Sequence, residues 1–194
     1  MHRLEMETAS NTYTRTAIGL HWAIALLIFA AFPLGLYMHD LPLSPDKLRL
    51  YSYHKWIGIA VFGLALVRVT WRAVHPLPAL PHTMLPWERF VALVVHGLLY
   101  VLIFAAPVSG WLTSSAEGFQ TVWFGVIPLP DLIGRDKELA RSLGDLHANL
   151  NFLMLAIVGA HALAALKHHF VERDDVFTRM VPVLARSPKM SIKR

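Results

Sequence analysis

The stretch LGDLHANLNFLMLAIVGAHALAALKHHF, residues 143–170, decides the fold of this chain. Between Leu146 and Leu166 it contains no Asp, Glu, Lys or Arg. At a rise of about 1.5 Å per residue, a helix of this length crosses a hydrocarbon core about 30 Å thick. The stretch is therefore predicted to be a membrane-spanning helix.

Two histidines interrupt this apolar helix, His147 near one end and His161 fourteen residues later. With about 3.6 residues per turn, they lie on nearly the same face, about 21 Å apart along the axis. One helix face thus offers an imidazole near each membrane surface. A single histidine in such a helix is typically an interior residue, but two on one face require partners elsewhere in the chain.

The composition of the whole chain indicates an integral membrane protein. Of its 194 residues 55% are hydrophobic and only 16% charged, and the mean hydropathy is +0.46. The length suits one all-α domain of about four helices. The absence of cysteine excludes disulfides, thiolate-bound zinc and iron–sulfur clusters, which leaves the eleven histidines as the obvious metal ligands.

Three more apolar segments are long enough to span a membrane, residues 17–38, 51–71 and 90–111. Together with the stretch above they predict a four-helix transmembrane bundle. The longest connection is expected at residues 112–144. We expect its aromatic first half to lie against the membrane interface and its charged second half to form a short surface helix. The polar N-terminal residues do not resemble a removable signal peptide.

The distribution of basic residues predicts the orientation. Four spans put both termini on one side, and by the positive-inside rule the side richer in Lys and Arg is cytoplasmic. No motif points to nucleic acid, so the net charge of +5 reflects topology. We expect a transmembrane domain over residues 12–182 and a basic cytoplasmic tail over 183–194. The basic residues assigned to the inner side are Arg3, Arg15, Arg68, Arg72, Arg89, Lys167, Arg173, Arg179, Arg186, Lys189, Lys193 and Arg194.

Matching the histidines by depth gives two pairs. His21 lies in the first turns of the first span and His161 lies a turn and a half before the end of the fourth, so both lie near the cytoplasmic side. His54 and His147 open spans that start from the outer face. Two imidazoles facing each other across a bundle are the axial ligands of a low-spin haem, whose saturated iron is suited to electron transfer. Small residues beside these ligands would let a flat macrocycle approach the backbone: Gly19, Gly58 and Gly159.

Other sites fit the spacing less well. Zinc prefers a tetrahedral set that includes Cys or carboxylate ligands, and a di-iron bundle needs buried Glu residues, which the spans lack. The sequence contains no GxSxG motif of the kind that holds a catalytic serine, which argues against nucleophilic catalysis. Histidines acting as proton relays, and glycines or histidines serving only in helix packing, remain alternatives on spacing alone.

The chain resembles the bacterial cytochrome b561 family over residues 12–182. The resemblance implies a four-helix cytochrome of the inner membrane that holds two b haems on His21, His54, His147 and His161 and exchanges electrons with ubiquinone. Some members resemble a superoxide oxidase, but the outer loops differ here, so the periplasmic donor stays open. The resemblance rests on these motifs, in order: LHW (20–22), YHKWIGI (53–59), LVRVTWR (66–72), HGLLYVLIFAAPVSGW (96–111), FGVIPLP (124–130), LHANL (146–150) and GAHALAALKHHF (159–170).

Several further residues of the sequence are also candidates for the site, and most of them have two interpretations. His168 resembles a quinone-site residue of the family, or it belongs to a basic helix end that favours the membrane surface. Arg15, Arg68 and Arg72 either pair with haem propionates or extend to the headgroups. His96 is expected to be a buried hydrogen-bonding residue.

The outer face carries a local positive patch, Lys47, Arg49 and Lys55, which either attracts a small anion such as superoxide or contacts lipid and solvent. Three functions remain open: an electron carrier, a superoxide:quinone oxidoreductase, and the membrane-anchor cytochrome b subunit of a larger respiratory enzyme.

Overall fold

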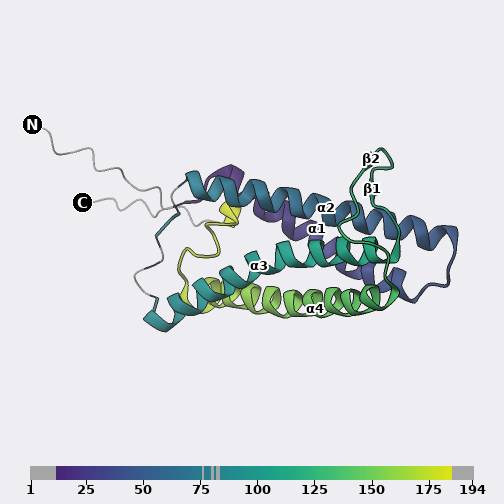
Figure 1. Cartoon of the computed structure of the whole chain (residues 1–194). Helices are drawn as coiled ribbons and strands as arrows, with labels where there is room; N and C mark the ends of the chain where they lie inside the picture. The colour runs from purple at the N-terminus through teal and green to yellow at the C-terminus, as the bar shows by residue number, and fades with distance from the viewer. Residues whose placement is uncertain (1–11, 76, 80, 82–83, 185–194) are drawn as a thin grey trace, which may run out of the picture.

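The computed structural model describes residues 12–75, 77–79, 81 and 84–184. Four long helices run along one another as a bundle (Figure 1), and each is long and apolar enough to cross a membrane. This confirms the predicted helical membrane architecture. The basic residues of the tail from 186 onward, together with Arg3, lie outside the described residues. The helices are α1 (Arg15–Asp40), α2 (Pro45–Val74), α3 (Pro86–Glu117) and α4 (Lys137–Lys167).

Local sequence explains where these helices begin. The side chains of Thr14, Ser44 and Asp136 each accept a backbone N–H of the first turn, which satisfies a donor that has no partner within the helix. Pro45 and Pro86 occupy first helical positions, where proline's missing N–H costs nothing.

The helices are longer than hydropathy predicted, because polar caps set their ends. The second helix begins at Pro45, where residue 51 was expected, and α3 continues to Glu117 before Gly118 ends it with a left-handed φ of 79°. The expected surface helix in the charged part of the third connection is wrong. Those residues are the first turns of α4, which Asp136 starts.

The bundle buries little of its apolar surface. A small core of Ala65, Leu102, Ile103, Ala106 and Met154 joins α2, α3 and α4. In each of the four helices at most 17% of the most apolar stretch is buried, so most large apolar side chains face outward. Such a surface fits a lipid surrounding. Helix α1 begins and α4 ends at the same end of the bundle (Figure 1), which we call the inner end; the opposite end is the outer end.

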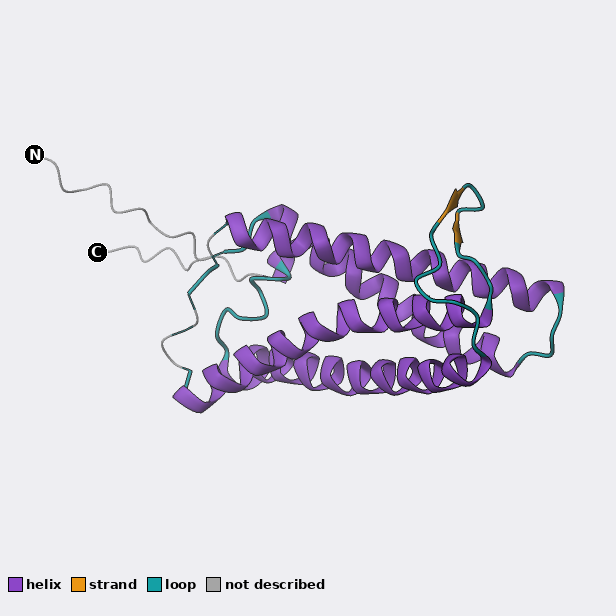
Figure 2. Ribbon diagram, viewed as in Figure 1, coloured by secondary structure: helices purple, strands orange, loops and turns teal. Residues whose placement is uncertain are grey.

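A short β-hairpin lies at the outer end of the bundle. Its strands β1 (Val122–Trp123) and β2 (Ile127–Pro128) pair antiparallel and project beside α2 (Figure 2). Trp56 of α2 donates its indole N–H to the Val122 carbonyl at 2.7 Å, which holds the hairpin against the helix. The hairpin is absent from the sequence prediction, because two-residue strands leave no periodic signal.

The chain beyond α4 folds back across the inner end. It forms a π-helical turn, η1 (His168–Glu172), and a 3₁₀ turn, η2 (Pro182–Leu184). Trp22 of α1 donates its indole N–H to the Met180 carbonyl at 2.8 Å, and Arg179 donates to the Ala79 carbonyl at 2.6 Å. This return segment, residues 173–184, therefore links α4 to α1 and to the connection between α2 and α3.

Candidate functional site

The outer histidine pair joins two helices. His54 of α2 and His147 of α4 face each other with ring centroids 6.1 Å apart and planes at 88°. Neither opens its helix, as hydropathy had suggested, because the caps extend α2 and α4 outward by several residues. The pair lies about three turns inside each helix.

The inner pair has a similar geometry. His21 of α1 and His161 of α4 have ring centroids 6.3 Å apart and planes at 69°. The structure thus brings together the histidines that depth matching had paired. Their role as haem ligands stays a prediction.

Both pairs have the spacing that a shared iron requires. Metal–imidazole bonds are about 2 Å long, so the coordinating nitrogens of a bis-imidazole site lie about 4 Å apart and the ring centres about 6 Å apart. The observed 6.1 and 6.3 Å match this value. The donor set of two neutral imidazoles is also one that haem iron accepts.

Hydrogen bonds fix the tautomer of the outer pair. The Nδ1 of His54 lies 3.1 Å from the Ala31 carbonyl oxygen, and the Nδ1 of His147 lies 2.9 Å from that of Ala106. A carbonyl can only accept, so each Nδ1 carries the proton and each Nε2 keeps its lone pair. Metal-ligating histidines are typically oriented in this way.

Each imidazole of the outer pair also lies against a glycine of a neighbouring helix, and the sequence did not predict this contact. A Cβ added at Gly35, four residues after Ala31, would come within 3.1 Å of Cε1 of His54. A Cβ added at Gly110, four residues after Ala106, would come within 3.0 Å of Cε1 of His147. A carbonyl and the glycine one turn later thus cradle each outer imidazole. The available signal was the Ala-x₃-Gly spacing in both helices.

The glycines that sequence reasoning singled out lie in open positions. A Cβ added at Gly19, Gly58 or Gly159 would meet no atom within 4 Å. Gly58 lines a cavity together with His54 and His147.

A third histidine lies at the inner pair. The ring centroid of His96 is 5.1 Å from that of His161, which is too close for an iron between them. His96 is exposed, so the expectation of a buried residue is wrong, although its Nδ1 does bond the Ala92 carbonyl at 2.6 Å. Its spacing leaves His21 as the better partner of His161.

Two of the three candidate arginines, Arg68 and Arg72, contact the same tyrosine, Tyr100. Arg68 donates to the Tyr100 hydroxyl at 3.3 Å and to the Ala17 carbonyl at 3.2 Å, one turn before His21. The guanidinium of Arg72 lies 5.1 Å from the centre of the Tyr100 ring. Arg15 is exposed at the first residue of α1. All three lie at the inner end, as predicted.

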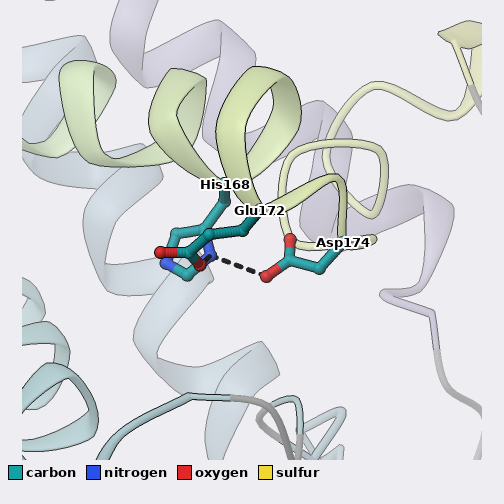
Figure 3. Close-up of side chains that lie close together, drawn as sticks. All are labelled: His168, Glu172 and Asp174. Atoms are coloured by element: carbon teal, nitrogen blue, oxygen red, sulfur yellow. Dashed lines mark hydrogen bonds and ion pairs between the residues drawn. The ribbon is translucent and has the colours of Figure 1, made fainter.

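His168 contacts acidic residues that the sequence analysis did not single out. Its Nδ1 lies 2.6 Å from an Asp174 carboxylate oxygen and 2.5 Å from one of Glu172 (Figure 3). The π-helical turn and the left-handed Arg173, with φ of 57°, return the chain toward His168. A regular helix would carry Asp174 away from His168, so no helical spacing rule could find this cluster.

The outer cations are partly engaged by the backbone. Lys47 donates to the carbonyls of His39 and Leu41 at the C-terminal end of α1, a favourable place for a positive charge. Lys55, next to His54, donates to the Phe119 carbonyl at 3.1 Å. Arg49 lies 3.8 Å from Asp46 and is exposed.

Apolar spans that carry facing imidazoles are typical of membrane-bound b-type cytochromes, and comparison with known proteins supports that class. Residues 12–183 match the model of the prokaryotic cytochrome b561 family. The chain belongs to this family, whose members bind b-type haem and transfer electrons in bacterial membranes.

Relatives of known name match almost end to end. The chain is 32% identical to cytochrome b561 homolog 2 of Escherichia coli K12, over 89% of this chain and 94% of the relative. It is 30% identical to the probable superoxide oxidase CybB of Yersinia pestis, over 88% and 96%. A cytochrome b562 of Cereibacter sphaeroides is 32% identical over 90% and 98%.

Proposed function

We propose that this protein carries electrons across the bacterial inner membrane from a periplasmic donor to ubiquinone, through two b haems. His21 and His161 would hold the inner haem, and His54 and His147 the outer one. The functional unit is residues 12–182, with residues 183–194 as a basic cytoplasmic tail. The observation that supports the proposal is that the ring centroids within the two histidine pairs lie 6.1 and 6.3 Å apart. The α4 members of these pairs, His147 and His161, are fourteen residues apart.

The protein's own contribution is to hold and separate the two sites. A bis-imidazole haem has no open coordination position and exchanges single electrons when bound. Ala31 and Ala106 orient the outer imidazoles through Nδ1, and Gly35 and Gly110 admit the rings against the helix backbones. Helix α4, which contains no proline, sets the separation of the sites at about 21 Å.

The positive-inside rule supports cytoplasmic termini. The described basic residues near the inner end outnumber those near the outer end only slightly. The basic residues within 1–11 and 185–194 are expected on the side of the two termini from the number of spans alone. The inner set in the described chain is Arg15, Arg68, Arg72, Arg89, Lys167, Arg173 and Arg179, and the outer set is Lys47, Arg49, Lys55, Arg135, Lys137 and Arg141.

Superoxide is the donor that we propose. One relative carries the name of a probable superoxide oxidase, and Lys55 directly follows the outer ligand His54. A positive patch raises the encounter rate of a small anion in a salt-dependent way. The overall reaction balances as two superoxide ions plus one quinone and two protons giving two dioxygen molecules and one quinol.

Ubiquinone would be reduced at the inner end. His168 lies two helical turns beyond the inner ligand His161 and can donate a hydrogen bond to a quinone oxygen. Arg68 and Arg72, held on Tyr100, supply positive charge there that suits haem propionates.

Stopped-flow spectroscopy of the purified, haem-loaded protein tests both halves. We expect two haems per chain, rapid haem reduction by superoxide that slows with ionic strength, and reoxidation by ubiquinone. Neutralising Lys47, Arg49 and Lys55 together should slow only the first step. A folded protein without haem would refute the whole proposal. Reduction no faster than that of a haem peptide would refute the superoxide donor, and a stoichiometric catalytic subunit retained in mild detergent would favour the membrane-anchor role.

A further inference from the structure

The reduction of quinone needs protons as well as electrons, and the inner end contains a cluster able to deliver them. Each quinone takes up two electrons and two protons to become quinol, and bis-imidazole haems supply only the electrons. We propose that Glu172, His168 and Asp174 form a proton relay, in which Glu172 passes protons from the aqueous phase through His168 to quinone and Asp174 holds the imidazole in position. This inference rests on the proposed quinone site and assigns roles to two residues beyond it.

The three side chains converge on one nitrogen. Carboxylate oxygens of Glu172 and Asp174 lie 2.5 and 2.6 Å from Nδ1 of His168 (Figure 3). The imidazole side chain is 10% exposed and that of Asp174 is 11% exposed, whereas that of Glu172 is 28% exposed. The cluster therefore runs from a partly hydrated carboxylate to a nearly buried imidazole, the order that a path from water to a buried substrate needs.

The backbone fixes Asp174 as an acceptor. One of its oxygens accepts the N–H of Val176 at 3.0 Å, and the other faces His168. The N–H of Asp174 itself donates to the His168 carbonyl at 3.2 Å, so residue 174 is tied to residue 168 by main chain and side chain. Asp174 is thus held in place to keep the imidazole oriented, while the more exposed Glu172 is the group that meets solvent.

Neighbouring charges connect the relay to the rest of the inner end. Lys167 lies 2.7 Å from Glu172 and 2.9 Å from Glu88, which comes from the first turn of α3. Glu172 is therefore shared between a lysine and a histidine. The next acid, Asp175, pairs instead with Arg179 at 3.0 Å, and the ring of His169 packs on Phe177.

The step balances without another reactant. His168 gives the proton on Nε2 to a quinone oxygen for each electron that the quinone receives, because Nδ1 faces both carboxylates. Glu172 takes a proton from water and passes it to Nδ1 as Nε2 releases its own, while Asp174 holds the ring in place. The ring then returns to the tautomer with the proton on Nε2 before the second proton follows. After two electrons and two protons the quinol leaves, and His168, Glu172 and Asp174 are restored to their starting protonation.

Two electron acceptors separate proton delivery from electron transfer. Haem-loaded protein in nanodiscs is reduced and mixed either with a short-chain ubiquinone, which needs protons, or with ferricyanide, which takes electrons alone. We expect Asp174→Asn, which loosens the imidazole, and Glu172→Gln, which removes the proton donor, each to slow oxidation by ubiquinone about tenfold. The double variant should be slowed about a hundredfold, the lower end of the range that general acid–base catalysis contributes. The ubiquinone reaction of these variants should also show a larger slowing in D₂O and a steeper fall at high pH, where protons are scarce.

Asp175→Asn is the matched control, because it removes the adjacent carboxylate and leaves the cluster intact. Its rates should equal those of the unaltered protein with both acceptors. Equal slowing of the Asp174 or Glu172 variants with ferricyanide would show a structural defect and overturn the relay, as would ubiquinone rates equal to those of the control. If the unaltered protein reduced by dithionite is oxidised by ferricyanide but not by ubiquinone, the proposed quinone function itself fails.

Discussion

Gly110 lies directly against the imidazole of His147. A Cβ at this position would approach Cε1 within 3.0 Å and Nδ1 within 3.2 Å, and the ring has little freedom to move because Ala106 accepts its Nδ1 proton. The glycine is needed here for the close approach of a side chain and not for backbone conformation. Gly35 has the same relationship to His54 in the other helix hairpin.

Gly110→Ala should therefore disturb the outer haem alone. We expect the added methyl group to turn His147, so that the outer low-spin signal in the electron paramagnetic resonance spectrum shifts or is lost while the inner signal persists. Gly63→Ala, which meets no atom within 4 Å, is the control and should leave both signals unchanged. Identical spectra for the two variants would show that the cradle has no part in ligation.

Single ligand replacements should act locally, because the two sites are about 21 Å apart. His21→Ala or His161→Ala should remove the inner haem, and His54→Ala or His147→Ala the outer one, each halving the haem content. A redox titration should then show one of two components missing. Equal loss of both haems from every variant would contradict the pairing.

Ser109→Ala should raise the midpoint potential of the outer haem. The Ser109 hydroxyl donates to the Ala106 carbonyl at 2.8 Å, so toward Nδ1 of His147, 3.1 Å away, it can only accept. Removing an acceptor makes the imidazole a weaker electron donor and favours ferrous iron. A hydrogen bond of about 0.5–1 kcal/mol corresponds to about 20–40 mV. Ser142→Ala, on the exposed face of α4, should change neither potential.

Arg68→Gln should lower the midpoint potential of the inner haem. The guanidinium bridges Ala17 and Tyr100 beside His21, and loss of a nearby positive charge stabilises the ferric state. We expect a fall on the order of 50 mV in a spectroelectrochemical titration, which is the Coulomb energy of a unit charge at roughly 10 Å in an intermediate dielectric. Arg49→Gln, exposed at the outer end, should leave the inner potential unaltered. A rise after Arg68→Gln would contradict the assigned direction.

The histidine pairs could be predicted from sequence because depth in a membrane is set by distance along a helix and by the order of the connections. His21 and His161 share a depth whatever the packing of the spans. Which helix face meets which ring depends on packing, so the contacts of Gly35 and Gly110 could not be predicted. Asp174 was missed for a further reason, since its approach to His168 requires a π-helical turn and a left-handed residue, and no apolar periodicity records either.

The return segment, residues 173–184, bears on the order of assembly. It ties the end of α4 to Trp22, the neighbour of the proposed inner ligand His21, and it is the last described part of the chain to leave the ribosome. All four spans are complete before it exists. The contact between Trp22 and Met180 can therefore form only after the last span has been made, and we expect cofactor loading at this end to be possible before that contact forms.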